Sequence, residues 1–133
     1  MSEENVEIVR GIFDAWAKGE FGRALLPHLD EHVLYLIPSD FPEFGVFVGP
    51  EGVGEHTRRF FAQWKRLAIE AKHVEAAGDT VLVKCIQRGT GRASGIDGNS
   101  FYCMLFTFRR DKIVRMEVVL DEAEALEAAG LSE

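Results

Sequence analysis

The sequence has few of the features that mark several large classes of protein. It contains only two cysteines, Cys85 and Cys103, and both fall in segments typical of strands, which excludes a disulfide framework and suits a reducing compartment. No apolar run reaches the roughly 18 residues of a membrane-spanning helix. The N-terminus opens on acidic residues instead of the basic and apolar regions of a secretory signal. We therefore expect a cytoplasmic protein with no membrane partner.

Basic residues are also too scattered to form a nucleic-acid surface. Fifteen Lys and Arg stand against 22 Asp and Glu, and the formal net charge is -7. A surface of that sign repels a phosphate backbone, and no stripe of Lys and Arg offsets it. The composition therefore predicts no nucleic-acid partner.

What the chain does contain is enough apolar material for one core. Its 133 residues are 47% hydrophobic, which falls in the size range of a single domain that buries a real interior. We find no internal repeat, linker or low-complexity tract. The sequence predicts one domain over residues 1–133.

The first half of the chain predicts three helices and one strand. An amphipathic helix opens the chain, because apolar residues recur there at three- and four-residue spacing. A shorter helix is expected over 21–29, a strand over 32–37 and a loop over 38–49. Pro50 then opens a third helix. The apolar side of the first helix carries Val6, Val9, Phe13 and Trp16, and that of the third carries Val53, Thr57, Phe60, Phe61 and Trp64.

The second half predicts four strands and a closing helix. The strands are expected over 68–76, 80–88, 100–110 and 112–120, separated by turn-forming segments. Asp121 and Gly130 are typical residues for the two ends of the last helix. This order predicts an α+β fold in which a curved, mostly antiparallel sheet wraps around helices into a cone, a cystatin-like α+β barrel.

Five segments make the chain resemble the nuclear transport factor 2-like superfamily, in its SnoaL-like and ketosteroid isomerase-like branch. The resemblance covers nearly the whole length. It implies a conical pocket, often a homodimer through the outer face of the sheet, and substrates such as steroids, polyketides or epoxides, or none. The segments are residues 4–10 (ENVEIVR), 17–20 (AKGE), 49–53 (GPEGV), 87–92 (QRGTGR) and 121–131 (DEAEALEAAGL).

Side chains alternate across a strand, so each predicted strand assigns its residues to the pocket or to the outer face. The inward set is apolar apart from Tyr35, Gln87, Tyr102 and the thiol of Cys85. Such a wall suits a small apolar molecule, although the same side chains could simply fill the cone as core. The predicted ligand-binding residues are Trp16, Tyr35, Ile37, Phe60, Trp64, Val83, Cys85, Gln87, Tyr102, Met104, Phe106, Met116, Val118 and Leu120.

The catalytic sets that the resemblance implies are not present in this sequence. A ketosteroid isomerase uses a carboxylate base, a Tyr and a protonated carboxylic acid, and by resemblance these positions hold Ile37, Ile12 and Met104. The charged residues of the epoxide hydrolases and the last-strand Asp of the SnoaL-type cyclases are replaced in the same way. Those positions hold Cys85, Gln87, Val118 and the apolar inward residues of the last strand.

Any acid or base must then come from elsewhere, and Asp40 with His56 is the catalytic pair that we predict. Glu43 in the same loop is an alternative carboxylate. A carboxylate at the mouth of an apolar cone has its pKa raised by desolvation, and a nearby imidazole can relay a proton. Loop carboxylates are, however, usually solvated, so an inert Asp40 remains open.

We expect no metal and no cofactor. His28 and His32 are four residues apart, but a strand is expected to begin near His32, so one helical face does not present both imidazoles. The Gly89-x-Gly91 stretch leads into a strand and offers no helix N-terminus for a phosphate.

Three functional hypotheses remain at the level of the sequence. The first is a pocket protein that binds or processes a small apolar molecule. The second is an isomerase, polyketide cyclase or epoxide hydrolase-like enzyme that uses unfamiliar residues. The third is a dimerisation module with a filled cone. A homodimer through the outer sheet face is expected, because Cys103, Leu105 and Val119 would otherwise leave an apolar patch uncovered.

Overall fold

The computed structural model describes residues 2–21, 23–41 and 43–131. The first half contains both helices and strands, and strands dominate the second half. The elements are α1 (Ser2–Ala17), the 3₁₀ turn η1 (Leu26–His28), β1 (Leu29–Ile37), β2 (Gly45–Val48), α2 (Gly49–Ala62), β3 (Trp64–Ala77), β4 (Thr80–Gly91), β5 (Asp97–Arg109), β6 (Lys112–Val119) and α3 (Glu122–Ala129).

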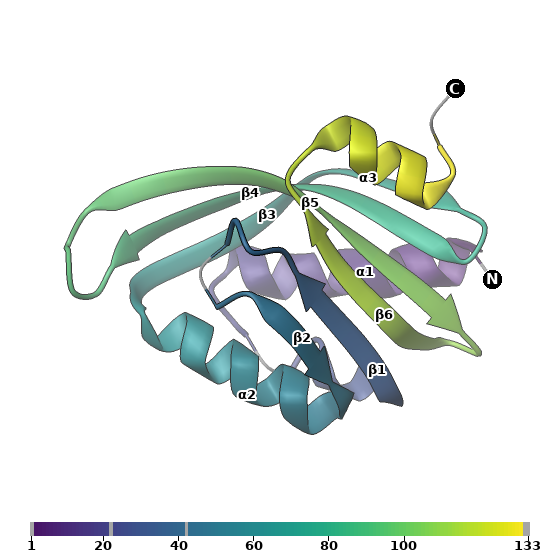
Figure 1. Ribbon diagram of the computed structural model, residues 1–133, viewed down its shortest axis with the longest axis horizontal. Coiled ribbons are helices and arrows are strands. Elements are labelled where there is room, and N and C mark those ends of the chain that lie inside the picture. The colour runs from purple at the N-terminus through teal and green to yellow at the C-terminus, as the bar shows by residue number, and fades with distance from the viewer. Residues whose placement is uncertain (1, 22, 42, 132–133) are drawn as a thin grey trace.

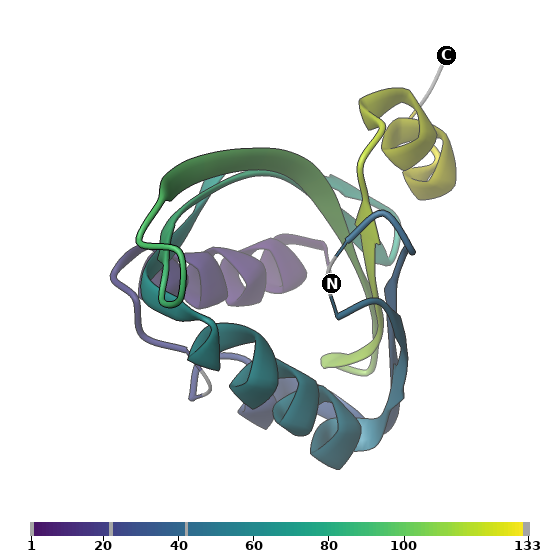
Figure 2. The same ribbon diagram turned by 60° about the vertical axis from the view of Figure 1, so that its left-hand side comes forward.

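The six strands form one strongly curved sheet in the order β2-β1-β6-β5-β4-β3. Only the β1–β6 pair is parallel, and every other neighbouring pair is antiparallel. The sheet arches over α1 and α2, while α3 lies outside it (Figures 1 and 2). The predicted α+β cone with a mostly antiparallel sheet is therefore confirmed.

The two inner helices are held by their apolar stripes. Helix α1 packs mainly on β3 and buries the predicted residues Val9, Phe13 and Trp16, with Ile12 beside them. Helix α2 begins at Gly49, which has a φ of +73°, and Pro50 lies in its first turn. In the described ranges, no helix has the length and apolar character to cross a membrane.

Three predictions for the segment between α1 and α2 were wrong. Among the described residues of 21–29 there is only the short turn η1, and β1 begins at Leu29 instead of His32. Proline cannot continue a helix interior, and here Pro27 lies inside the 3₁₀ turn. The predicted loop also contains β2, which pairs with β1 through registers such as Tyr35 with Phe47.

The outer sheet face is partly covered by the chain's own α3. Leu82, Cys103 and Leu105 form a second buried cluster with Ala125 and Ala129 of this helix. The expectation that Cys103 and Leu105 form an uncovered patch was therefore wrong. As predicted, Asp121 caps α3, accepting a hydrogen bond from the backbone N of Glu124 at 3.0 Å. Docking of α3 removes this apolar surface from water without a partner chain.

Candidate functional site

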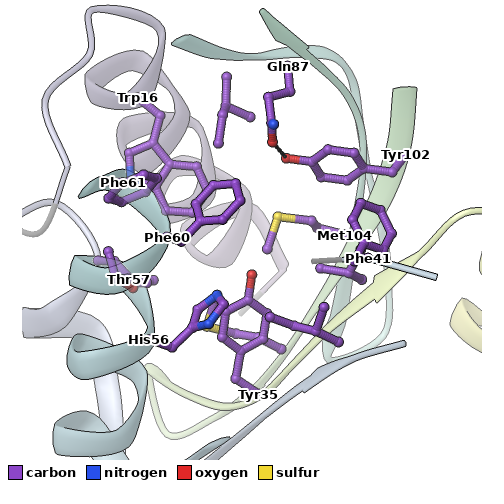
Figure 3. A pocket seen from close by; sticks show the side chains of 15 residues that line it. Trp16, Tyr35, Phe41, His56, Thr57, Phe60, Phe61, Gln87, Tyr102 and Met104 are labelled. Atoms are coloured by element: carbon purple, nitrogen blue, oxygen red, sulfur yellow. Dashed lines mark hydrogen bonds between the residues drawn. The ribbon is translucent and has the colours of Figure 1, made fainter. Parts of the chain in front are cut away.

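The concave face of the sheet, α1 and α2 enclose a cavity of about 50 Å³. Roughly 10–15 Å³ is enough to hold one water molecule, so the cavity has room for several waters or for a compact organic molecule. Its wall is mostly aromatic and aliphatic (Figure 3). The 15 lining residues are Trp16, Leu25, Tyr35, Ile37, Phe41, His56, Thr57, Phe60, Phe61, Ile69, Gln87, Tyr102, Met104, Met116 and Val118.

Alternation along the strands placed most of the predicted ligand-binding residues at this cavity. The positions from α1, α2 and the four strands β1, β4, β5 and β6 converge on one space, as the cone requires. The predicted residues that line it are Trp16, Tyr35, Ile37, Phe60, Gln87, Tyr102, Met104, Met116 and Val118.

Five predicted residues lie elsewhere. Val83, Cys85 and Phe106 belong to the buried core but do not line the cavity. Trp64 opens β3 and its ring lies against Gly89, where an added Cβ would be 2.5 Å from the indole. Leu120 follows the end of β6 and is 45% exposed, because the alternation of the strand ends before it.

The buried thiol of Cys85 is unreactive. Burial raises its pKa well above the ordinary value for cysteine, and the nearby Cys103 adds to the shift. The thiolate is the reactive form of cysteine. Cys85 is therefore a small core residue in this structure.

Sequence reasoning missed several lining residues for identifiable reasons. Thr57 and Phe61 were placed on the apolar side of the third helix, but only Phe60 and Trp64 from that side were assigned to the cavity. Phe41 lies in a loop without periodicity, and its ring meets that of Tyr102 edge-on at 5.3 Å. Loops carry no alternation, so only the apolar character of Phe41 could have signalled its position. The other two missed residues are Leu25 and Ile69.

One polar pair in the wall is internally satisfied. The hydroxyl of Tyr102 donates a hydrogen bond of 2.8 Å to Oε1 of Gln87, and both side chains are buried. Figure 3 shows this bond at the sheet side of the cavity. Burial raises the pKa of Tyr102 well above its ordinary value, so the hydroxyl stays protonated and keeps this bond.

His56 is a buried imidazole on the opposite wall. It is 4% exposed and lies among the rings of Tyr35, Phe47 and Phe60, at centroid distances of 5.4, 4.4 and 6.0 Å. Within the described part of the chain, its Nδ1 atom is buried without a hydrogen-bond partner. Burial lowers the pKa of His56, an effect that Glu43 opposes and Arg59 reinforces. The ring is therefore a neutral imidazole near pH 7.

Two other polar groups reach the cavity. The hydroxyl of Tyr35 points into the space beside Met104 (Figure 3), and burial raises the pKa of Tyr35, so it is a donor. The indole Nε1 of Trp16 is buried and has no acceptor among the residues that the structure describes. With His56, these groups make a wall that can orient a polar ligand atom.

The structure does not bring Asp40 to His56. Asp40 is exposed and does not line the cavity, whereas the neighbouring Phe41 turns inward. The carboxylate whose charge acts on His56 is Glu43, which has a φ of +58° and lies 3.6 Å from Nε of Arg59. An exposed carboxylate keeps its hydration, which explains why Asp40 remains outside the apolar cone.

The two histidines with helical spacing do not meet on one helix. His28 ends η1, and His32 lies exposed on β1. Over residues 2–21, 23–41 and 43–131, no three His, Cys, Asp or Glu side chains form a group suited to a metal ion.

An α+β cone with an apolar cavity between sheet and helices defines the class of this protein as NTF2-like, with a ketosteroid isomerase-like fold. The chain belongs to the SnoaL-like domain family, whose sequence pattern matches residues 9–116. No functionally curated relative matches the chain.

Solved structures with the same fold are distant in sequence. An NTF2-like protein of unknown function from Burkholderia pseudomallei K96243 is 18% identical, with a TM-score of 0.78 over 95% of this chain and 97% of that one. A putative SnoaL-like polyketide cyclase from Jannaschia sp. CCS1 is 19% identical, with a TM-score of 0.78 over 99% and 94%. A hypothetical protein with a ketosteroid isomerase-like fold from Catenulispora acidiphila DSM 44928, in complex with trimethylamine, is 19% identical, with a TM-score of 0.73 over 94% and 93%.

Proposed function

We propose that this protein binds a small, mostly apolar molecule in the cone cavity. The observation that carries the proposal is the combination of an apolar wall with buried polar atoms that lack partners, namely Nδ1 of His56 and Nε1 of Trp16. A buried polar atom without a partner costs about 1–3 kcal/mol. A ligand that supplies the partner recovers this cost and gains the burial of its own apolar surface.

The size of the cavity restricts the ligand. A volume of about 50 Å³ suits a compact molecule, and a steroid-sized one requires side chains of the wall to move. The distant relative from Catenulispora acidiphila holds trimethylamine, a molecule of the compact kind. This likeness supports a compact ligand with at least one hydrogen-bonding atom.

Thermal-shift screening tests the proposal. The panel contains compact ketones, phenols and alcohols, followed by steroids, terpenoid epoxides, aromatic polyketides and fatty acids. A ligand that binds only the folded state raises the melting temperature by mass action. We expect shifts from compounds that combine a compact apolar body with one polar atom.

The matched variant is His56→Phe, which keeps an aromatic ring against Phe47 and removes the unpaired nitrogen. We expect its unliganded form to be at least as stable as the wild type and its ligand-induced shift to be smaller. A panel in which no compound shifts the wild type, or in which every hit shifts both proteins equally, contradicts the proposal.

A second candidate function is proton transfer, and the neutral buried His56 favours it. A neutral imidazole is a general base, and the protonated hydroxyl of Tyr35 can donate to an oxygen on which negative charge develops. The ligand would then carry a C–H group made acidic by an adjacent carbonyl. Deuterium exchange of such a hit in heavy water, followed by NMR, is the assay.

We expect His56→Gln to abolish this exchange and Asp40→Asn to leave it unchanged. If His56→Gln exchanges deuterium at the same rate as the wild type, His56 is not the base. If ligands bind but no hit exchanges, the protein is a binding protein only.

A homodimer through the outer sheet face also remains a proposal. Because α3 covers Cys103 and Leu105, these two residues no longer support a dimer interface. The residues that now support it are Val46 and Val48 of β2, each 61% exposed, and Phe101 of β5, which is 68% exposed. Apolar side chains of this size at a sheet face favour a covering partner. Light scattering at micromolar concentration should give twice the monomer mass, and a monomer mass would end this proposal.

A further inference from the structure

A second cavity lies directly beside the first one. It has a volume of about 240 Å³ and lies between α2 and the segment that precedes β1. Its lining includes Gly54 and Arg58 of α2. Trp16, Leu25, Thr57 and Phe61 line both cavities, so a single layer of side chains separates the outer cavity from the inner one.

Helix α2 explains this arrangement. His56 and Phe60 face the inner cavity, and Gly54 and Arg58 face the outer one. Thr57 and Phe61 are four residues apart, so they form one row along the helix at the boundary between the two faces. The absence of a side chain at Gly54 leaves space in the outer cavity. A Cβ added there would contact only Leu26, at 3.9 Å.

The partition between the cavities depends on one aromatic side chain. The ring of Phe61 lies against that of Phe21 at a centroid distance of 3.9 Å. Thr57 is fixed by a hydrogen bond of 2.8 Å from its hydroxyl to the carbonyl of Val53. Rotation of Phe61 about its side-chain bonds is therefore the smallest change that joins the two spaces.

The outer cavity carries a positive charge at its rim. Arg58 is exposed and makes no ion pair with any described residue, whereas the adjacent Arg59 faces Glu43. A guanidinium beside an apolar cavity suits a carboxylate attached to an apolar body. The buried indole donor of Trp16, unpartnered and in the shared wall, is a second group that favours a ligand oxygen here.

We propose that the two cavities form one site for an elongated amphipathic carboxylate. Its apolar end passes Phe61 into the inner cavity, and its carboxylate lies on Arg58. This inference rests on the proposed function, because it assumes that the inner cavity holds a ligand. It adds the chemical class of that ligand and the residue that recognises its charge.

Calorimetric titration with octanoate and with 1-octanol tests the inference on the full chain. The two probes share an alkyl chain and differ in charge. We expect octanoate to bind more tightly than 1-octanol to the wild type. Arg58→Gln should weaken octanoate about tenfold and leave 1-octanol unchanged, since only the charged hydrogen bonds are lost. Arg10→Gln, an equal change of charge on the exposed face of α1, is the matched control and should alter neither probe.

A second variant tests the path between the cavities. Gly54→Met places a flexible side chain in the outer cavity and leaves the inner wall unchanged. We expect it to weaken both octanoate and 1-octanol while a compact neutral ligand of the inner cavity keeps its affinity. This pattern requires a correctly folded protein, so a folding defect cannot imitate it.

The outcomes separate the two proposals. If compact neutral compounds bind but octanoate does not, or if Arg58→Gln leaves octanoate unchanged, the carboxylate inference is wrong and the proposed function stands. If octanoate, 1-octanol and the compact compounds all fail to bind, the proposed function is wrong as well.

Discussion

Individual residues of the cavity wall differ in whether their polar atoms have a hydrogen-bond partner in the protein. The hydroxyl of Tyr102 is used in a bond to Gln87, whereas no hydrogen bond joins the hydroxyl of Tyr35 to the other side chains drawn in Figure 3. Both tyrosines have pKa values raised by burial. The cavity wall therefore contains two phenols of similar chemistry, a buried one with a structural bond and a half-buried one that is free for a ligand.

This difference predicts unequal effects of removing each hydroxyl. Tyr102→Phe leaves Oε1 of Gln87 buried without its donor and should lower the free energy of unfolding by about 1–3 kcal/mol. Tyr35→Phe should change it by less than about 0.5 kcal/mol. Urea unfolding of both variants measures this, and equal losses would show that Tyr35 also has a structural bond.

The buried imidazole predicts a dependence of stability on pH. Because the pKa of His56 is lower in the folded chain than its ordinary value near 6.5, the unfolded chain binds more protons as the pH falls below that value. The free energy of unfolding should therefore decrease from about pH 7.5 towards pH 5, by at most about 1.4 kcal/mol per pH unit for one proton.

His56→Gln should flatten this decrease, since glutamine does not titrate. Burial, with help from Lys112, also lowers the pKa of His28, so part of the slope should persist in that variant and disappear only when His28→Gln is added. Identical slopes in the wild type and His56→Gln would show that His56 takes up its proton as readily when folded.

The wall residues of β1, β4, β5 and β6 were found from strand alternation, whereas Ile69 of β3 was missed. Gln87 and Met116 were predicted correctly to face the interior because charged neighbours fix the register of their strands, and Met104 because it belongs to the bulky apolar set of its strand. The same reasoning could not tell which inward residues line the cavity and which fill the core, as Val83 does. That distinction depends on where the helices lie above the sheet, and one sequence does not specify it.

At the scale of elements, the segment between β1 and α2 was the least predictable. The strand β2 has only four residues, GVFV, follows a loop segment and runs directly into α2. Its pairing with β1 is a tertiary contact that local propensity does not encode. Helices α1, α2 and α3 were easier to predict, because apolar stripes and terminal residues such as Asp121 and Gly130 are local signals, whereas the helix predicted over 21–29 was wrong.

One glycine inside a helix and one directly after a helix predict opposite responses to alanine. Gly11 lies inside α1, and an added Cβ there meets no atom within 4 Å, so Gly11→Ala should stabilise the protein by about 0.5–1 kcal/mol. Gly130 ends α3 with a φ of +79°, so Gly130→Ala should destabilise it by roughly 1–2 kcal/mol. Thermal and urea unfolding test both, and a loss in Gly11→Ala would mean that α1 needs flexibility at this residue.

At the scale of the whole molecule, the sheet buries apolar side chains on both faces. Its concave face holds the main core and the cavity, and its convex face carries a smaller cluster under α3. The α+β cone was predictable from element order and from the family resemblance. The cover that α3 provides was not, because the sequence shows an amphipathic helix without showing the surface on which it docks.

The most direct test of the central claim, that the cone cavity binds a small molecule, uses the methyl groups of Met104 and Met116. Both side chains line the cavity from different strands. With ¹³C-methyl methionine, the protein is titrated with the compound that gives the largest thermal shift, and the signals are assigned by Met→Leu substitution. We expect both methyl resonances to move and to reach saturation together. A compound that raises the melting temperature while both resonances stay still binds elsewhere, and that result would contradict the claim.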